Sequence, residues 1–198
     1  TTDRQYDDSN AVFEIKGTIT VSAPNGGENT WYVGDTDKQI RWAKAGDFDP
    51  AHNANYSFNV YLATDGGSLY EYTVVSGLLQ ADVCTGDSCT WTWEDPDAGV
   101  TGIPDKIGTA NKIKIALNGD ETNVFDVSNE VFLIRGVITV TAPNGGETWL
   151  ATESNNITWT KKGSIASFTL KYSLNSGADY LTTIAGAVDA ATYCTGDS

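Results

Sequence analysis

Few residues of this chain have types and spacing that suggest catalysis. His52 is the only histidine among 198 residues and lies in a polar stretch, where a solvated side chain is a better interpretation than a general base. The run Glu94-Asp95-Pro96-Asp97 could hold the carboxylate pair of a glycosidase. Because Pro96 and the following Gly99 are turn residues, we interpret the run first as a turn. We therefore expect that the chain is not an enzyme.

The three cysteines are the other side chains that could do chemistry. Cys84 and Cys89 enclose the residues Thr-Gly-Asp-Ser, which suit a hairpin turn, so a disulfide could join its two strands. Cys194 opens the same phrase again, and we expect its partner to lie beyond Ser198. A metal site would need more ligands than this spacing offers. A hairpin disulfide indicates an oxidising, extracellular setting.

Acidic residues close to the domain boundary suggest a calcium site as a further hypothesis. Asp120, Glu121 and Asp126 precede the boundary, and Asp7 and Asp8 are their equivalents near the N-terminus. Oxygen ligands in such a place could hold Ca²⁺ and stiffen the boundary. Because neither an EF-hand loop nor a nonapeptide repeat is present, a solvated acidic surface stays the main interpretation. No other cofactor is expected.

Two tryptophans and two asparagines could take part in contacts with sugars. Trp91 and Trp93 lie two residues apart in an alternating stretch, so they lie on the same face of a strand. If exposed, they would form an aromatic platform for sugar rings, but burial in the core is the favoured interpretation. Asn55 and Asn156 begin glycosylation sequons, a short pattern that often occurs by chance.

The elements that must position these residues occur in a repeat. The hexapeptide Ala-Pro-Asn-Gly-Gly-Glu occupies residues 23–28 and again residues 142–147, and the preceding residues 13–21 recur as 132–140. A period this long indicates an array of similar domains. We expect residues 1–16 to be the C-terminal strand of a preceding repeat, 17–135 a complete repeat and 136–198 the N-terminal part of the next. Because the sequence contains no Met, it is expected to be a piece of a longer protein.

Short alternating segments separated by Gly- and Pro-rich turns predict an all-β fold. Seven or more short strands in one repeat suggest a two-sheet sandwich of the immunoglobulin or fibronectin III type. The Cys…Trp…Cys spacing of true immunoglobulin domains is missing. The expected strands of the complete repeat are residues 18–23, 39–42, 56–63, 69–75, 83–84, 89–93, 113–117 and 131–134.

The boundary between the two repeats has almost no linker. Phe132 and Ile134 lead through the single Gly136 to Ile138 without a Pro- or Ser-rich segment. A strand that leaves one sandwich and enters the next after one residue gives little hinge freedom. We therefore expect a stiff rod.

The N-terminal segment could act as a strand donor. Residues 7–16 correspond to the last strand of a repeat, with Val12, Phe13 and Ile15 as its apolar positions. A second repeat that stopped at residue 198 would expose sheet edges, which favour pairing with another chain, and this segment could add to such an edge. A continuing array that supplies its own strands is the favoured alternative.

The balance of charge limits the classes of partner. A net charge of −14, from 26 acidic and 12 basic residues, argues against nucleic acid and anionic membranes, which bind basic surfaces. No apolar run is long enough to span a membrane. An acidic exterior suits solubility or repulsion between neighbouring rods.

The repeated motif also resembles a known domain family. Its first copy reads Val21-x-Ala-Pro-Asn-Gly-Gly-Glu-x-x-Trp31, then Ile40-x-Trp42 and Gly46, and the second copy follows the same pattern from Val140 to Gly163. It resembles the Ig-like domain of Ser/Thr-rich GPI-anchored fungal wall proteins and of tandem repeats in giant bacterial and archaeal surface proteins. The resemblance implies an extracellular structural or adhesive role and carries no catalytic residues.

These patterns lead to one main hypothesis and two alternatives. The main hypothesis is a structural repeat of an extracellular fibre, filament or giant cell-surface protein, whose partners are adjacent repeats or copies of itself. The first alternative is a carbohydrate-binding or adhesion module that contacts surface glycans. The second is an accessory domain of a secreted enzyme.

Overall fold

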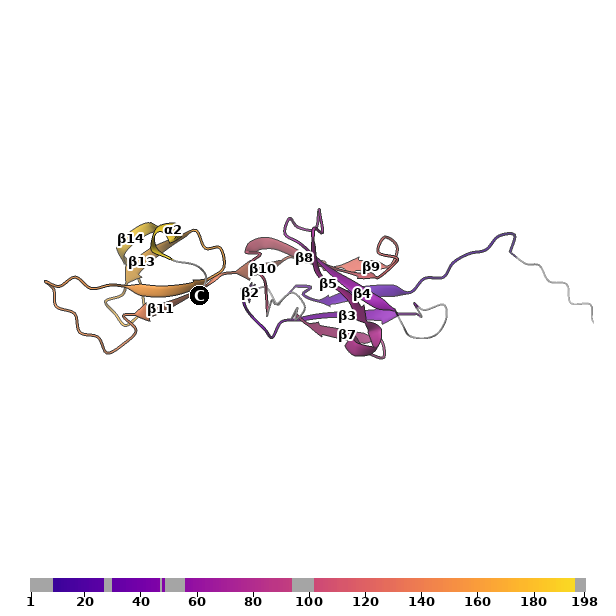
Figure 1. Ribbon diagram of the computed structural model, residues 1–198, viewed down its shortest axis with the longest axis horizontal. Helices are drawn as coiled ribbons and strands as arrows, with labels where there is room; N and C mark the ends of the chain where they lie inside the picture. Colours follow the sequence, from indigo (N-terminus) through magenta and orange to yellow (C-terminus); the bar gives the residue numbers. More distant parts are fainter. Residues whose placement is uncertain (1–8, 27–29, 47, 49–55, 94–101, 195–198) are drawn as a thin grey trace, which may run out of the picture.

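The computed structural model describes residues 9–26, 30–46, 48, 56–93 and 102–194 and is built mainly of β-strands (Figure 1). The expected all-β class is confirmed. The first unit contains two sheets that pack face to face around one core, and the second unit contains two separate strand pairs. Two four-residue helices, α1 (Gln80–Val83) and α2 (Ala190–Tyr193), are the only α-helices among these residues.

The smaller sheet of the first unit shows the alternation that the sequence predicts. In β1, Ile19, Val21 and Ala23 are buried and the residues between them are exposed, because successive side chains of a strand point to opposite faces. The sheet has the order β1–β3–β7–β6, and all its pairs are antiparallel. Its strands are β1 (Thr18–Ala23), β3 (Gln39–Ala45), β6 (Cys84–Thr85) and β7 (Ser88–Thr92).

The larger sheet has the order β2–β10–β8–β4–β5, and β9 also pairs with β8. Only the β10–β2 pair is parallel. The strands of this larger sheet are β2 (Thr30–Tyr32), β4 (Ser57–Ala63), β5 (Tyr72–Leu79), β8 (Gly108–Leu117), β9 (Phe125–Val127) and β10 (Phe132–Arg135).

The core between the two sheets is rich in aromatic rings. Trp42 from the smaller sheet meets Phe58 from the larger one with 5.3 Å between ring centroids. The ring centroid of Trp31 lies 4.7 Å from that of Phe132 and 5.8 Å from that of Trp93. These side chains are nearly inaccessible to solvent, so their burial contributes a large share of the stability of the unit.

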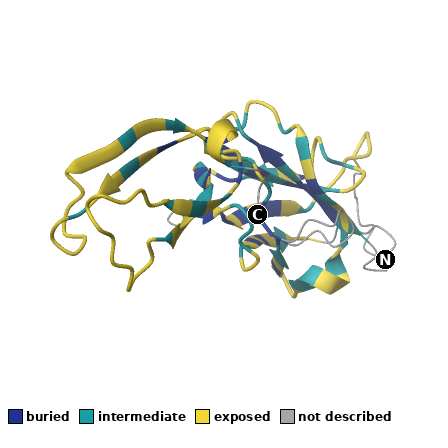
Figure 2. Ribbon diagram, turned by 60° about the vertical axis from the view of Figure 1, so that its left-hand side comes forward, coloured by how far each residue is buried: buried dark blue, intermediate teal, exposed yellow. Residues whose placement is uncertain are grey.

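The second unit repeats the first four long strands and their register. It contains β11 (Val137–Ala142), β12 (Thr158–Lys162), β13 (Ser167–Tyr172) and β14 (Thr182–Asp189). Among its described residues, the strands pair as β11–β12 and β13–β14. Val140 pairs with Trp159 and the register then shifts before Ala142, as it does after the Val21–Trp42 pair. Figure 2 shows that most of this unit is exposed.

Several expected strands have different bounds in the structure. The strand expected at 69–75 begins only at Tyr72, because Asp65 Oδ1 accepts hydrogen bonds from the backbone N–H groups of Gly67, Ser68 and Leu69. These bonds hold a loop where the apolar alternation already begins. The strand expected at 83–84 starts one residue later, since Val83 ends α1. A helix of one turn has no detectable period in the sequence.

Candidate interaction site at the unit junction and the open half-sandwich

The junction between the two units is a continuous strand. β10 ends at Arg135, Gly136 follows, and β11 begins at Val137. The carbonyl of Arg135 accepts a hydrogen bond of 2.9 Å from Val33 N, which continues the β2–β10 pairing to the junction. The backbone is therefore held by the first unit up to the single connecting glycine.

Residues beside the junction also bring the two units into contact. A β-carbon on Gly163 would lie 2.9 Å from Ile107 and 3.0 Å from Val33, so the backbone of the second unit approaches the first closely. Ser164 Oγ donates a hydrogen bond to Asp105 of the first unit. Gly163 has a φ of +87°, which an L side chain rarely adopts. The second unit thus rests on loops of the first and is not joined by the strand alone.

Glycines equivalent to those of the junction lie at the N-terminal end of the first unit. Gly17 and Gly46 correspond to Gly136 and Gly163, and a β-carbon on Gly46 would lie 3.1 Å from Gly17 Cα. Lys16 Nζ donates to Asp120 Oδ2 at 2.6 Å. This hydrogen bond lowers the pKa of Asp120 and raises that of Lys16. The described residues 9–15 extend away from the unit (Figure 1).

The Asn-Gly turn connects the start of a unit to its last strand. Asn25 Oδ1 accepts a hydrogen bond from Asn129 N, and Asn25 Nδ2 donates to Val21 O at 3.0 Å. A residue 104 positions later in the chain is thus fixed beside this turn, three residues before β10 begins. In the second unit, Glu147 accepts from the backbone N–H groups of Asn144 and Gly145, which lowers the pKa of Glu147.

The second unit has an open apolar face. A hollow of about 930 Å³ lies between its strand pairs, and Trp149, Trp159, Phe168 and Tyr172 are among the residues that line it. Trp159 and Phe168 keep the 5.3 Å ring contact of Trp42 and Phe58. Among the described residues, no strand pairs with the outer edges of β12 and β13. This face has the shape of a core that lacks part of its cover.

The junction residues and the proposed strand donors differ sharply in burial. Phe132 and Ile134 lie in the core, Gly136 connects the units, and Ile138 is exposed in the hollow of the second unit. In contrast, the apolar residues of the N-terminal segment, namely Val12, Phe13 and Ile15, are exposed to solvent.

The expected disulfide between Cys84 and Cys89 is present. The two residues face each other across the β6–β7 pair. Cys194 follows α2 as Cys84 follows α1, and it has no disulfide partner among the described residues.

The two tryptophans considered as a sugar platform do not form one. Trp93 is 3% exposed and packs against Trp31, and Trp91 is half-buried against the same core. Their rings are inclined by 36°. Cys89 and Trp91 lie on the inward face of β7 and Trp93 follows directly after the strand, so both tryptophan rings pack against the core. The structure thus agrees with the favoured interpretation, burial in the core, and not with an exposed platform.

The carboxylates considered for calcium bind donors of the protein itself. Asp126 accepts from Val21 N at 2.7 Å, and Glu121 accepts from Asn59 and from Gly119 N. The bond from Gly119 is the main cause of the lowered pKa of Glu121. Asp120 is paired with Lys16. The described part of the chain contains no group of three or more His, Cys, Asp or Glu residues placed for a metal ion.

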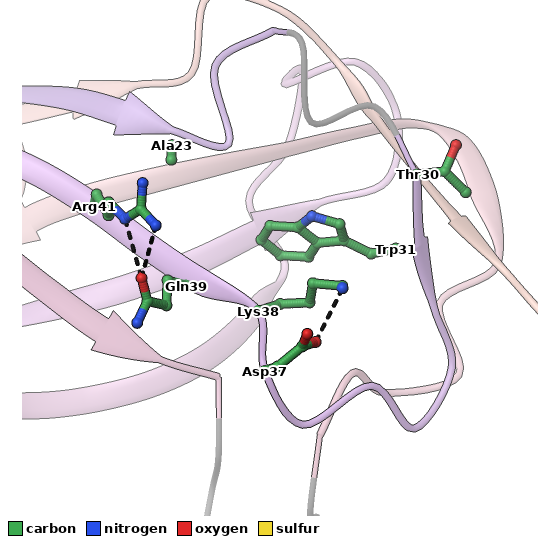
Figure 3. A pocket seen from close by; sticks show the side chains of 7 residues that line it. All are labelled: Ala23, Thr30, Trp31, Asp37, Lys38, Gln39 and Arg41. Atoms are coloured by element: carbon green, nitrogen blue, oxygen red, sulfur yellow. Dashed lines mark hydrogen bonds and ion pairs between the residues drawn. The ribbon is translucent and has the colours of Figure 1, made fainter.

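A second, polar hollow of about 380 Å³ lies beside Trp31 in the first unit. Figure 3 shows Arg41 hydrogen-bonded to the neutral side chain of Gln39, and Lys38 paired with Asp37 at 2.9 Å. The pairing raises the pKa of Lys38 and lowers that of Asp37.

Some of the residues singled out in the sequence lie outside the described ranges. They are His52, Asn55, Asp7, Asp8 and the run 94–97. Asn156 is exposed, as a glycosylated asparagine must be. None of the described helices is long and apolar enough to cross a membrane.

Comparison of the chain with protein-family models, with curated proteins and with solved structures found no match.

Proposed function

We propose that this chain is a structural segment of an extracellular fibre or giant cell-surface protein, built from tandem Ig-like β-sandwiches that form a stiff rod. The junction carries the proposal. One residue, Gly136, separates β10 from β11, and Gly163 and Ser164 lie against Ile107 and Asp105 of the first unit. A flexible linker would need several residues free of such contacts.

Charge and disulfide chemistry agree with an extracellular setting. The Cys84–Cys89 bond is of a kind that persists in oxidising compartments. A net charge of −14 keeps neighbouring molecules apart and disfavours nonspecific association. The role is thus mechanical, and the chain supplies length and stiffness.

The rod is tested by its rotational diffusion. We expect ¹⁵N relaxation of the 198-residue chain to give one anisotropic tumbling tensor for both units. A variant with six Gly-Ser residues inserted between Arg135 and Gly136 is the matched control, and its units should tumble separately. If the chain without the insertion tumbles like the control, the stiff-rod proposal is wrong.

The carbohydrate-binding alternative has less support from the structure. Trp93 is buried and Trp91 is half-buried, so the pair that motivated this alternative offers no flat exposed surface.

A further inference from the structure

Two loops of the first unit form the surface on which the second unit rests. Val33 and Gly34 follow β2, and Asp105 and Ile107 lie just before β8. Gly34 N donates a hydrogen bond of 2.8 Å to the carbonyl of Ile103, which ties the two loops together. We call the surface of Val33, Gly34, Asp105 and Ile107 the docking face. It is a fixed part of the first unit.

The second unit meets the docking face with the end of β12 and the residues after it. The side chain of Lys162 lies along Gly34, where a β-carbon would be 3.3 Å from Nζ. A β-carbon on Gly163 would lie 3.1 Å from Oδ1 of Asp105, and Ser164 Oγ donates a hydrogen bond to the same carboxylate. The second unit thus brings a cation and a hydroxyl donor to a face that carries a carboxylate.

The first unit has different residues at the equivalent positions. Ala45-Gly46-Asp47-Phe48 corresponds to Lys162-Gly163-Ser164-Ile165. The glycine is the same in both segments, whereas the cation is replaced by a methyl group and the hydroxyl by a carboxylate. The segment of the second unit is therefore positively charged and that of the first is negatively charged.

We propose that the docking face selects the unit that follows it, accepting the second unit and rejecting another copy of the first. This inference rests on the proposed function and names the partner of the junction, a unit with a cation and a hydroxyl donor in this segment. A copy of the first unit in the same place would bring the carboxylate of Asp47 to that of Asp105. Like charges placed opposite each other suppress a wrong partner, so the order of units along the rod is specified by charge.

The close approach at the junction makes this difference in charge effective. An aspartate in place of Ser164 lies well within the screening length of Asp105, about 10 Å at 0.1 M salt, because the serine hydroxyl already contacts that carboxylate. Moving the second unit away would relieve the repulsion, but it would also lose the packing of Val33 and Ile107 against Gly163. The repulsion therefore competes directly with docking.

The selection is tested by reversing the charges on both sides of the junction. In the full chain with Cys194→Ser, spin labels are attached to Thr20→Cys in β1 and Thr160→Cys in β12, two exposed strand positions. Double electron–electron resonance measures the distribution of distances between the labels. We expect a single narrow distribution for this parent chain, because the docking face holds the second unit in one orientation.

Two variants remove the match of charges, and a third restores it. Lys162→Ala/Ser164→Asp gives the second unit the charges of the first at this contact, so the narrow distribution should be lost. Asp105→Lys in the parent chain should also broaden the distribution, because the new lysine repels Lys162. Asp105→Lys combined with Lys162→Ala/Ser164→Asp brings opposite charges together again and should restore the narrow distribution.

Two controls separate the effect of charge from that of shape. Ile165→Phe also copies the first unit, which has Phe48 at this position, but it adds no charge and should keep the narrow distribution. In 1 M NaCl the screening length falls to about 3 Å, so the distribution of Lys162→Ala/Ser164→Asp should narrow. The side chains of Lys162, Ser164 and Asp105 are exposed, so these substitutions do not disturb the cores.

Three results would overturn the inference while the rod stands. They are a narrow distribution in Lys162→Ala/Ser164→Asp, failure of Asp105→Lys to restore it in that variant, and an equal broadening by Ile165→Phe, which would show that shape decides. In each case the parent chain keeps its narrow distribution. A broad distribution in the parent chain would instead contradict the rod itself, and the selection with it.

Discussion

At the scale of single residues, two glycines share a left-handed backbone conformation but have different surroundings. Gly77 has a φ of +75° in β5, and a β-carbon there would meet nothing within 4 Å. Gly102 has a φ of +88°, and a β-carbon there would lie 2.4 Å from Asp35 O. The equivalent of Gly77 in β14 is Ala187, with a φ of 51°. The fold therefore accepts a side chain at this bend, although at a conformational cost.

These surroundings predict unequal costs for the same substitution. Gly77→Ala should lower the free energy of unfolding by about 1 kcal/mol, because only the left-handed backbone opposes it. Gly102→Ala should lower it by about 3 kcal/mol, because the added methyl also forces Asp35 to move. Urea unfolding of both variants measures the difference. Equal losses would show that the close approach of Gly102 to Asp35 does not matter.

At the scale of elements, the β6–β7 hairpin is closed by the Cys84–Cys89 disulfide. The double variant Cys84→Ser/Cys89→Ser should lower the free energy of unfolding by about 2 kcal/mol, the loop-entropy value for so small a ring. Cys194→Ser is the matched control, because Cys194 forms no disulfide with a described residue, and it should leave the value unchanged. Urea unfolding without reductant is the measurement. No loss in the double variant would contradict the structural role of the bond.

The alternation of apolar residues and the internal repeat predict most of the long strands. The strand expected at 18–23 is β1 with the same bounds, since its alternation is undisturbed between two turns. Tyr72 begins β5 later than expected because of the Asp65 side chain, and hydropathy does not register such a bond. β9 has only three residues, of which Phe125 is exposed, so it has no alternation to detect.

The sequence does not predict contacts between residues that are far apart along the chain. The repeat identifies equivalent segments, but it does not show that Asn129 N reaches Asn25 or that Gly163 approaches Ile107. Such contacts depend on how the strands are arranged in space. The expectation for Trp91 and Trp93 left exposure open for the same reason, because alternation gives a common face without saying which face is buried.

At the scale of the whole molecule, 26 acidic residues against 12 basic ones cause repulsion within the folded chain. Added sodium chloride should raise the melting temperature, because ions screen this repulsion over about 10 Å at 0.1 M. EDTA at constant ionic strength should leave the melting temperature unchanged, since Asp120, Glu121 and Asp126 bind protein donors. Calorimetry distinguishes the two effects. A lower melting temperature in EDTA would support the calcium hypothesis.

The uninterrupted passage from β10 to β11 has a mechanical consequence. A pulling force applied to the second unit enters the first along β10, whose neighbours β2 and β8 are hydrogen-bonded to it side by side. Because these bonds lie across the direction of pull, β10 can slide only if several of them rupture together. The load is thus carried in shear, and the strand that connects the units also anchors them under tension.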